Sequence, residues 1–291
     1  MVLRASLRAG CLTLACVGLA GCGGGSSATV SSVAAPSSAP GTGTVATSTS
    51  SAPVQNYVVG QCYRDDGWQL TPCTQPHQKE ITAVVDTSQY ADDMVMRGVL
   101  RTWTCNNVLP GYVGSSSAGF SRIFATWVPT ADVPDPTQQI VCAASVGKPD
   151  DSGAQTVTYT VRNRIKDQGY VPYRLCTKER PSTTTTDSLT FVSCKKPHRA
   201  ETTGGFVLGA PNGRYPGLAT AQSDATNECL PLDRTYLGVE HTTQVTAYSS
   251  ITGRTGWERG ITLVGCFIES KKGTFVKPLK GMKHQPLAHF R

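Results

Sequence analysis

Eight cysteines fall into two sets of four with nearly the same spacing, and this pattern constrains the fold of the 291-residue chain more than any other feature. The second and third cysteines are 32 positions apart in the first set and 35 apart in the second, and the third and fourth are 37 apart in both. Shared spacing in one frame indicates an internal duplication. The sets are Cys62, Cys73, Cys105 and Cys142, followed by Cys176, Cys194, Cys229 and Cys266.

The residues around the second cysteine repeat as well. Both copies contain the signature Cys-x-x-Pro-His-x-x-Glu, and a Tyr-x-Gly follows each third cysteine. We therefore interpret the chain as two homologous domains, at residues 57–165 and 166–282, followed by a basic tail end at 283–291. Besides Cys73 and Cys194, the signature residues are Pro76, His77, Glu80, Pro197, His198 and Glu201.

Each copy reads as strands, then a helix, then strands, which predicts an α+β fold rather than a doubly wound parallel sheet. The helices carry the third cysteine of each set and are expected at residues 89–107 and from Pro216 onward. Proline cannot continue a helix, so Pro110 and Pro231 should end them. Final hairpin strands are expected to close the two units, at residues 155–161 and 274–279.

An even number of cysteines in an exported chain indicates disulfide bonds. Four cysteines allow three pairings in each copy, and sequence alone does not choose between them. We favour the first cysteine paired with the second across neighbouring strands, and the helical cysteine paired with the one on the final strand. This choice leaves each copy closed, as independently folding domains require. The favoured pairs are Cys62–Cys73, Cys105–Cys142, Cys176–Cys194 and Cys229–Cys266.

The first 21 residues have the charge and length of an export signal. Arg4 and Arg8 precede a short apolar segment that ends in Leu19-Ala20-Gly21-Cys22. This tetrapeptide resembles the lipobox of bacterial lipoproteins, in which the cysteine is acylated and becomes the first mature residue. The resemblance implies that Cys22 is the lipid site and that the protein is held on the extracytoplasmic face of the cell membrane. The alternative is an ordinary signal peptide with a chance cysteine.

Residues 22–56 are expected to form a flexible tether behind this anchor. Between Gly23 and Asn56 no residue is charged, and 14 of 34 positions are Ser or Thr. Such a segment has too little apolar surface to offset its ordering entropy. A flexible chain of this length spans about 30–35 Å.

The motifs together resemble the septum formation-related domain of actinobacterial envelope proteins, in two tandem copies. The resemblance rests on Gly60-Gln61-Cys62, the Cys-x-x-Pro-His-x-x-Glu signature, the helical cysteine, Tyr-x-Gly and the final cysteine. The second copy departs from it at Arg174-Leu175-Cys176, and it alone has Trp257-x-x-Gly260. These differences suggest that the copies are not functionally equal. The family implies a role in the envelope or at the septum, and it supplies no catalytic residues.

His77 and His198 most suggest chemistry, so three kinds of site compete with a structural role. A metal site is disfavoured because His77 and Glu80 would point to opposite faces of a strand, and a disulfide-bonded cysteine offers no thiolate. A cysteine nucleophile needs a free thiol. If all eight cysteines pair in disulfides, no free thiol remains. A histidine base would need a partner, and no Gly-x-Ser-x-Gly elbow is present. We therefore expect no metal and no cofactor.

The favoured interpretation of the signature is structural. Proline fixes the turn, the histidine packs beside the disulfide, and the glutamate bonds to backbone or to a basic residue. The second interpretation is partner recognition by an exposed Pro-His pair. The possible binding residues are then Pro76, His77, Glu80, Pro197, His198 and Glu201.

The net charge of +7 does not indicate a nucleic-acid partner. Two of the 27 basic residues leave with the signal, and six lie after Ser270, where there is no acid. Residues 57–270 then hold 19 basic and 20 acidic residues, which is not the composition of a basic nucleic-acid-binding fold. The basic end suits anionic lipids or wall polymers near the anchor.

The sequence therefore predicts a lipid-anchored envelope protein that binds rather than catalyses. Its expected partners are division or envelope-assembly proteins, or an anionic wall polymer. The alternatives are a wall-modifying hydrolase that uses His77 or His198, and a purely structural spacer.

Overall fold

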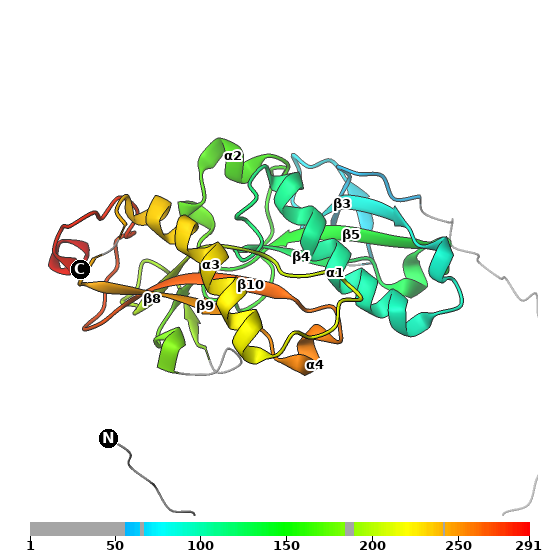
Figure 1. Cartoon of the computed structure of the whole chain (residues 1–291). Helices are drawn as coiled ribbons and strands as arrows, with labels where there is room; N and C mark the ends of the chain where they lie inside the picture. Colours follow the sequence, from blue (N-terminus) through cyan, green and yellow to red (C-terminus); the bar gives the residue numbers. More distant parts are fainter. Residues whose placement is uncertain (1–55, 65–66, 184–188, 241) are drawn as a thin grey trace, which may run out of the picture. The chain divides into compact units, whose positions relative to one another are not determined.

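The computed structural model of the protein describes residues 56–64, 67–183, 189–240 and 242–291 (Figure 1). Residues 51–291 belong to one compact unit. The predicted signal peptide at 1–21, Cys22 and nearly all of the predicted tether at 22–56 lie outside the described residues. No helix among the described residues is long and apolar enough to cross a membrane.

The first half of this unit is a five-stranded antiparallel sheet with one long helix. The strand order is β2-β1-β3-β5-β4, with β3 in the middle. The helix α1 packs against β3, β4 and β5. The strands are β1 (Cys62–Arg64), β2 (Gln69–Thr71), β3 (Lys79–Asp86), β4 (Ile123–Trp127) and β5 (Gln139–Val146).

The second half repeats this plan, which makes the α+β prediction correct. Its strand order is β7-β6-β8-β10-β9, again antiparallel, and α3 packs against β8, β9 and β10. The last strands of both sheets are eight residues long and carry the fourth cysteine at the same place. The strands are β6 (Cys176–Thr177), β7 (Phe191–Val192), β8 (Ala200–Val207), β9 (Val245–Ser250) and β10 (Leu263–Ser270).

The two long helices differ from the predicted bounds. α1 (Met94–Val113) and α3 (Leu218–Leu237) each have 20 residues, and Pro110 and Pro231 lie inside them. The expectation that these prolines end the helices was wrong. Both helices continue to a glycine in the left-handed conformation, Gly114 or Gly238, which is a common helix stop.

α1 begins later than predicted because a side chain caps its first turn. Asp93 accepts a hydrogen bond from the Met96 backbone N–H at 2.8 Å. The remaining helices are short. They are α2 (Arg164–Gln168), α4 (Arg254–Trp257) and 3-10 turns at Ser88–Tyr90, Thr130–Asp132, Val171–Tyr173, Pro181–Thr183 and Leu287–Phe290.

The predicted closing strands are single bridges instead. Val157 pairs with His77, and Phe275 pairs with His198, each as an isolated antiparallel bridge. Segments 155–161 and 274–279 therefore run beside the sheets without joining them as strands. The predicted positions of these segments beside the sheets are correct, but the segments are not regular β-strands.

The four disulfides have the favoured pairing. Cys105–Cys142 ties α1 to β5, and Cys229–Cys266 ties α3 to β10. The other two, Cys62–Cys73 and Cys176–Cys194, tie β1 and β6 to the turns that follow β2 and β7. Each half is thus closed by its own pair of disulfides.

The largest hydrophobic core nevertheless belongs to both halves. It joins Leu109, Val113 and Ile165 of the first half to Tyr236 and Ile268 of the second. The C-terminal segment contributes to it as well, because Met282, Leu287 and Phe290 are buried in the same cluster. Residues 283–291, expected as a basic tail end, therefore fold onto the second half, and their basic side chains remain at its surface.

Candidate functional site

The signature residues of both copies lie mostly inside the protein. Pro76 and Pro197 are exposed, but His77 and His198 are 1% and 0% exposed. Glu80 and Glu201 are equally buried. An exposed Pro-His pair, the second interpretation from sequence, is therefore wrong for the imidazoles.

Each histidine pairs with the segment that was expected to close its half. We call these segments, residues 155–161 for His77 and 274–279 for His198, the closing segments. The Nδ1 atom of His77 lies 2.8 Å from the Gln75 carbonyl, and that of His198 lies 2.8 Å from the Lys196 carbonyl. A carbonyl only accepts, so Nδ1 carries the ring proton in both. The backbone of His77 exchanges hydrogen bonds with Val157 at 2.9 and 2.8 Å. This geometry matches the structural role favoured from sequence.

Glu80 accepts three hydrogen bonds in the buried centre of the first half. The Tyr112 hydroxyl and the Thr160 hydroxyl donate to Oε1, each at 2.5 Å, and the Val161 N–H donates to Oε2 at 2.6 Å. Burial and the bond to Glu80 raise the pKa of the Tyr112 phenol above its ordinary value. The Arg162 guanidinium stacks on the Tyr112 ring at 5.0 Å. The buried Glu80 carboxylate on β3 thus binds both α1, through Tyr112, and the segment 155–161, through Thr160 and Val161.

Glu201 occupies the equivalent place with a different partner. Arg174 donates to it at 2.8 Å, and the Leu279 N–H donates at 2.6 Å. This explains why the second copy has Arg174-Leu175-Cys176 where the first has Gly60-Gln61-Cys62. The His198 Nε2 atom lies 3.9 Å from Glu201. The opposite-face argument made for His77 and Glu80 does not extend to this pair, because His198 precedes the strand β8 rather than lying in it.

Two groups of side chains have the spacing of metal ligands but not the chemistry. Cys62, Cys73 and Glu80 form one group, and Cys176, His198 and Glu201 form the other. All three cysteines are in disulfides, so they have no thiolate to donate to a metal. These groups are therefore parts of the structural centres just described.

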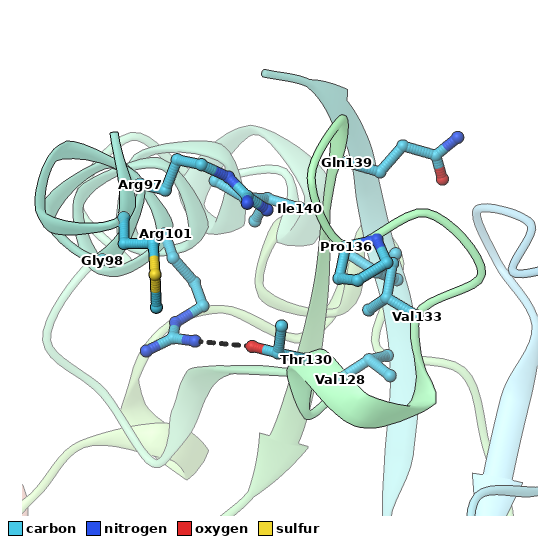
Figure 2. A pocket seen from close by; sticks show the side chains of 11 residues that line it. Arg97, Gly98, Arg101, Val128, Thr130, Val133, Pro136, Gln139 and Ile140 are labelled. Atoms are coloured by element: carbon cyan, nitrogen blue, oxygen red, sulfur yellow. Dashed lines mark hydrogen bonds between the residues drawn. The ribbon is translucent and has the colours of Figure 1, made fainter. Parts of the chain in front are cut away.

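A surface pocket of about 230 Å³ lies between α1 and the loop that joins β4 to β5. We call it the α1 pocket (Figure 2). Figure 2 shows Arg97 and Arg101 on the helix side, with Thr130, Val133 and Pro136 on the loop opposite. Its remaining lining residues are Met94, Gly98, Val128, Gln139, Ile140 and Val141.

The α1 pocket is cationic. No acidic side chain lines it, and within the described parts of the chain neither arginine forms an ion pair with a carboxylate. Arg101 donates to the Thr130 hydroxyl at 3.2 Å and stacks on Trp127 at 5.0 Å. The Nε atoms of both arginines are buried without a hydrogen-bond partner.

Among the described residues, the second half has no pair of arginines at the equivalent place on α3. α1 and α3 align without gaps over their full length, and the positions of Arg97 and Arg101 correspond to Ala221 and Ala225. Both alanines are fully buried. Arg97 and Arg101 were not predicted from the sequence, although aligning the copies through their helical cysteines shows this replacement of two arginines by two alanines. That the copies differ in function, as the Arg174 and Trp257 segments suggested, stays a prediction.

The fold and its sites define a disulfide-bonded α+β protein whose two halves share one plan and one core, with a cationic pocket on the first half. A family described as "Septum formation" matches residues 98–266. This stretch is more than half of the chain, and the protein belongs to that family. Membership connects it with a role in division or the envelope.

The matched stretch is continuous and runs from α1 to β10, so it crosses the junction between the halves. It therefore does not test whether each half is a separate copy of the family domain. No curated protein and no solved structure matched the chain.

Proposed function

We propose that the protein is a lipoprotein of the extracytoplasmic face of the cell membrane that binds a component of the envelope during septum formation. Its two halves are tandem copies of one domain, and only the first copy carries the binding site. Cys22 is the lipid anchor, and residues 22–56 are the tether. The observation that carries the binding role is the α1 pocket, where two arginines without a carboxylate partner face a partly apolar loop.

Binding is favoured over the hydrolase alternative by the state of the two histidines. A general base must reach the substrate proton, either directly or through one water. His77 and His198 are buried, and each uses Nδ1 to hold its own turn. The α1 pocket has no carboxylate, histidine or cysteine in its lining.

The anchor is tested by Cys22→Ser. We expect this variant to leave the membrane fraction for the soluble one, because a lipid chain contributes about 0.8 kcal/mol per buried methylene. Cys16→Ser, in the same signal segment, is the matched control and should stay with the membrane. Retention of the Cys22→Ser variant on membranes would contradict the anchor.

The binding role is tested against the spacer alternative in cells depleted of the protein. Wild-type protein should restore septum formation, whereas Arg97→Gln/Arg101→Gln should not, at equal membrane levels. A spacer needs no pocket, so full rescue by the double variant would favour the spacer. Arg214→Gln/Lys195→Gln removes two exposed charges elsewhere and should rescue like the wild type.

A further inference from the structure

We infer, building on the proposed binding role, that the α1 pocket takes the oxyanion of an anionic envelope polymer, either a phosphate or a carboxylate group. We further infer that the equivalent place on α3 offers no such site. Neither Arg97 nor Arg101 is part of the Cys-x-x-Pro-His-x-x-Glu signature.

The charge of the site selects an anion. Arg97 and Arg101 are four residues apart, so they lie on one face of α1. Each guanidinium presents donors in a planar fork that matches a carboxylate or a phosphate. Among the described residues, neither guanidinium forms an ion pair with a carboxylate. The pocket also flanks the first turns of α1, where the helix dipole adds a positive partial charge.

The size of the site selects a small group rather than a protein surface. A cavity of about 230 Å³ has room for about eight water volumes, which suits one phosphate or carboxylate and the unit that carries it. Val128, Val133 and Ile140 give this unit an apolar contact. A stable protein–protein interface buries about 1,200–2,000 Å² of surface. A pocket of this size is too small to form such an interface by itself. A repeating anionic polymer gains strength from many weak contacts.

The comparison of the two halves limits this kind of site to the first half at this helix position. Ala221 and Ala225 replace the arginines in α3, and both alanines are packed in the core. The equivalent place on α3 therefore offers no second pair of guanidinium groups, and the Arg97 and Arg101 signals should report one oxyanion bound at the α1 pocket.

The test uses the mature lipidated protein in a non-ionic detergent. Phenyl phosphate and benzoate are the two probes, because they share an apolar ring and differ in the anion. A hexaglutamate peptide is the third and represents an acidic protein segment. The readout is the NMR resonance of each arginine Nε–H, followed through a titration that also gives the stoichiometry.

Three variants distinguish binding in the α1 pocket from nonspecific attraction to positive charge. Arg97→Gln/Arg101→Gln removes the forks, and Arg214→Gln/Lys195→Gln removes the same charge from another surface. Gly98→Leu keeps both arginines and fills the pocket, since an added Cβ at Gly98 meets nothing within 4 Å. Replacing a glycine within a helix also favours the helix, so this variant should keep its melting temperature.

We expect phenyl phosphate, benzoate or both to shift the Arg97 and Arg101 signals, with one probe bound at the α1 pocket. The double arginine variant and Gly98→Leu should each weaken binding at least tenfold, and the charge control should bind within twofold of the wild type. A response to phenyl phosphate alone assigns a phosphate-bearing polymer, and a response to benzoate alone assigns a carboxylate-bearing one.

The inference is overturned if neither small probe shifts these signals, or if the charge control loses as much affinity as the double variant. Binding of hexaglutamate alone would also overturn it, in favour of an acidic protein partner. These outcomes leave the membrane anchor and the rescue experiment untouched, so failure here is distinguishable from failure of the proposed function.

Discussion

Asp233 is a buried carboxyl group in α3 with one hydrogen-bond partner. The Thr203 hydroxyl donates to Oδ1 at 2.5 Å, and Oδ2 has no partner. Burial raises the pKa of Asp233 from its ordinary value to about 7, and the bond to Thr203 opposes this in part. The folded protein thus holds a proton on Asp233 at a pH where the unfolded chain has lost it.

This residue makes the protein less stable as pH rises. Between about pH 4 and 7 the folded state binds more protons at Asp233 than the unfolded state, so the free energy of unfolding falls and then levels above 7. The full effect is about 4 kcal/mol. Asp233→Asn cannot ionise and should remove this slope, with its stability advantage over wild type growing from pH 5 to pH 8. Denaturant unfolding at several pH values measures this.

The exposed Asp224 on the same helix gives the control for that prediction. Asp224→Asn should follow the wild-type curve. A wild-type curve that is parallel to that of Asp233→Asn at all pH values would contradict the raised pKa.

Tyr112 and Tyr236 are equivalent tyrosines with unequal hydrogen bonding. Tyr112 donates to Glu80 at 2.5 Å, whereas the buried Tyr236 hydroxyl only approaches Glu201, without the geometry of an ordinary hydrogen bond. A hydrogen bond to a charged group contributes about 1.5–3 kcal/mol. Tyr112→Phe should therefore lower the free energy of unfolding by that amount, and Tyr236→Phe should change it by less than about 1 kcal/mol. Equal losses of unfolding free energy for Tyr112→Phe and Tyr236→Phe, measured by urea unfolding, would contradict this difference in hydrogen bonding.

At the scale of elements, the turn after α4 sets the position of α1. Gly260 has a φ of 77°, and a Cβ there would overlap the carbonyl of Val99 in α1. The Trp103 side chain of α1 donates to the Gly209 carbonyl at 3.1 Å, and Gly209 packs against Trp257. The Trp257-x-x-Gly260 segment of the second half therefore supports the helix that carries Arg97 and Arg101.

Gly260→Ala should displace α1 and cost more than the conformational penalty alone. Gly281 is the matched control, because its φ is 70° and an added Cβ meets nothing within 4 Å. Gly281→Ala should cost about 1–2 kcal/mol, the penalty for a left-handed non-glycine residue. Gly260→Ala should cost clearly more in thermal unfolding and should shift the NMR signals of Arg97 and Arg101. Equal costs would argue against the contact with α1.

The elements show where sequence reasoning succeeds and where it stops. The favoured disulfide pairing followed from the expected positions of the cysteines on strands and helices, and the α+β fold followed from the order of these elements. The helix ends did not, because Pro110 and Pro231 lie within helices that are held in place by their packed faces and their disulfides. The burial of His77 could not be read from its motif, since it depends on Val157, which is 80 positions away.

At the scale of the whole molecule, the shared core joins two halves that the sequence divides. Leu109 and Ile268 belong to one cluster, and the Gly119 and Gly205 backbones are hydrogen-bonded across the halves at 3.0 Å. We therefore predict one cooperative thermal transition for the described unit, with equal calorimetric and van't Hoff enthalpies. Residues 56–165 expressed alone should not fold stably. Two separate transitions, or a stable isolated half, would contradict this prediction.

The α1 pocket also lies beyond what sequence reasoning reached. Its arginines come from one helix, and its apolar side comes from a loop about 30 residues further along the chain. Nothing in the local sequence of either segment places them together. Only the alignment of the two copies marks Arg97 and Arg101 as unusual, because α3 has buried alanines there.

The most direct test of the account is photo-crosslinking in living cells from two equivalent positions. Met94 lines the α1 pocket and is 82% exposed, and Leu218 holds the same place on α3 and is 63% exposed. With a photoreactive amino acid at Met94, we predict an anionic envelope component in the crosslinked product, and its loss when Arg97 and Arg101 are replaced by Gln. The same product from Leu218, or one that persists without the two arginines, would contradict a binding site at the α1 pocket.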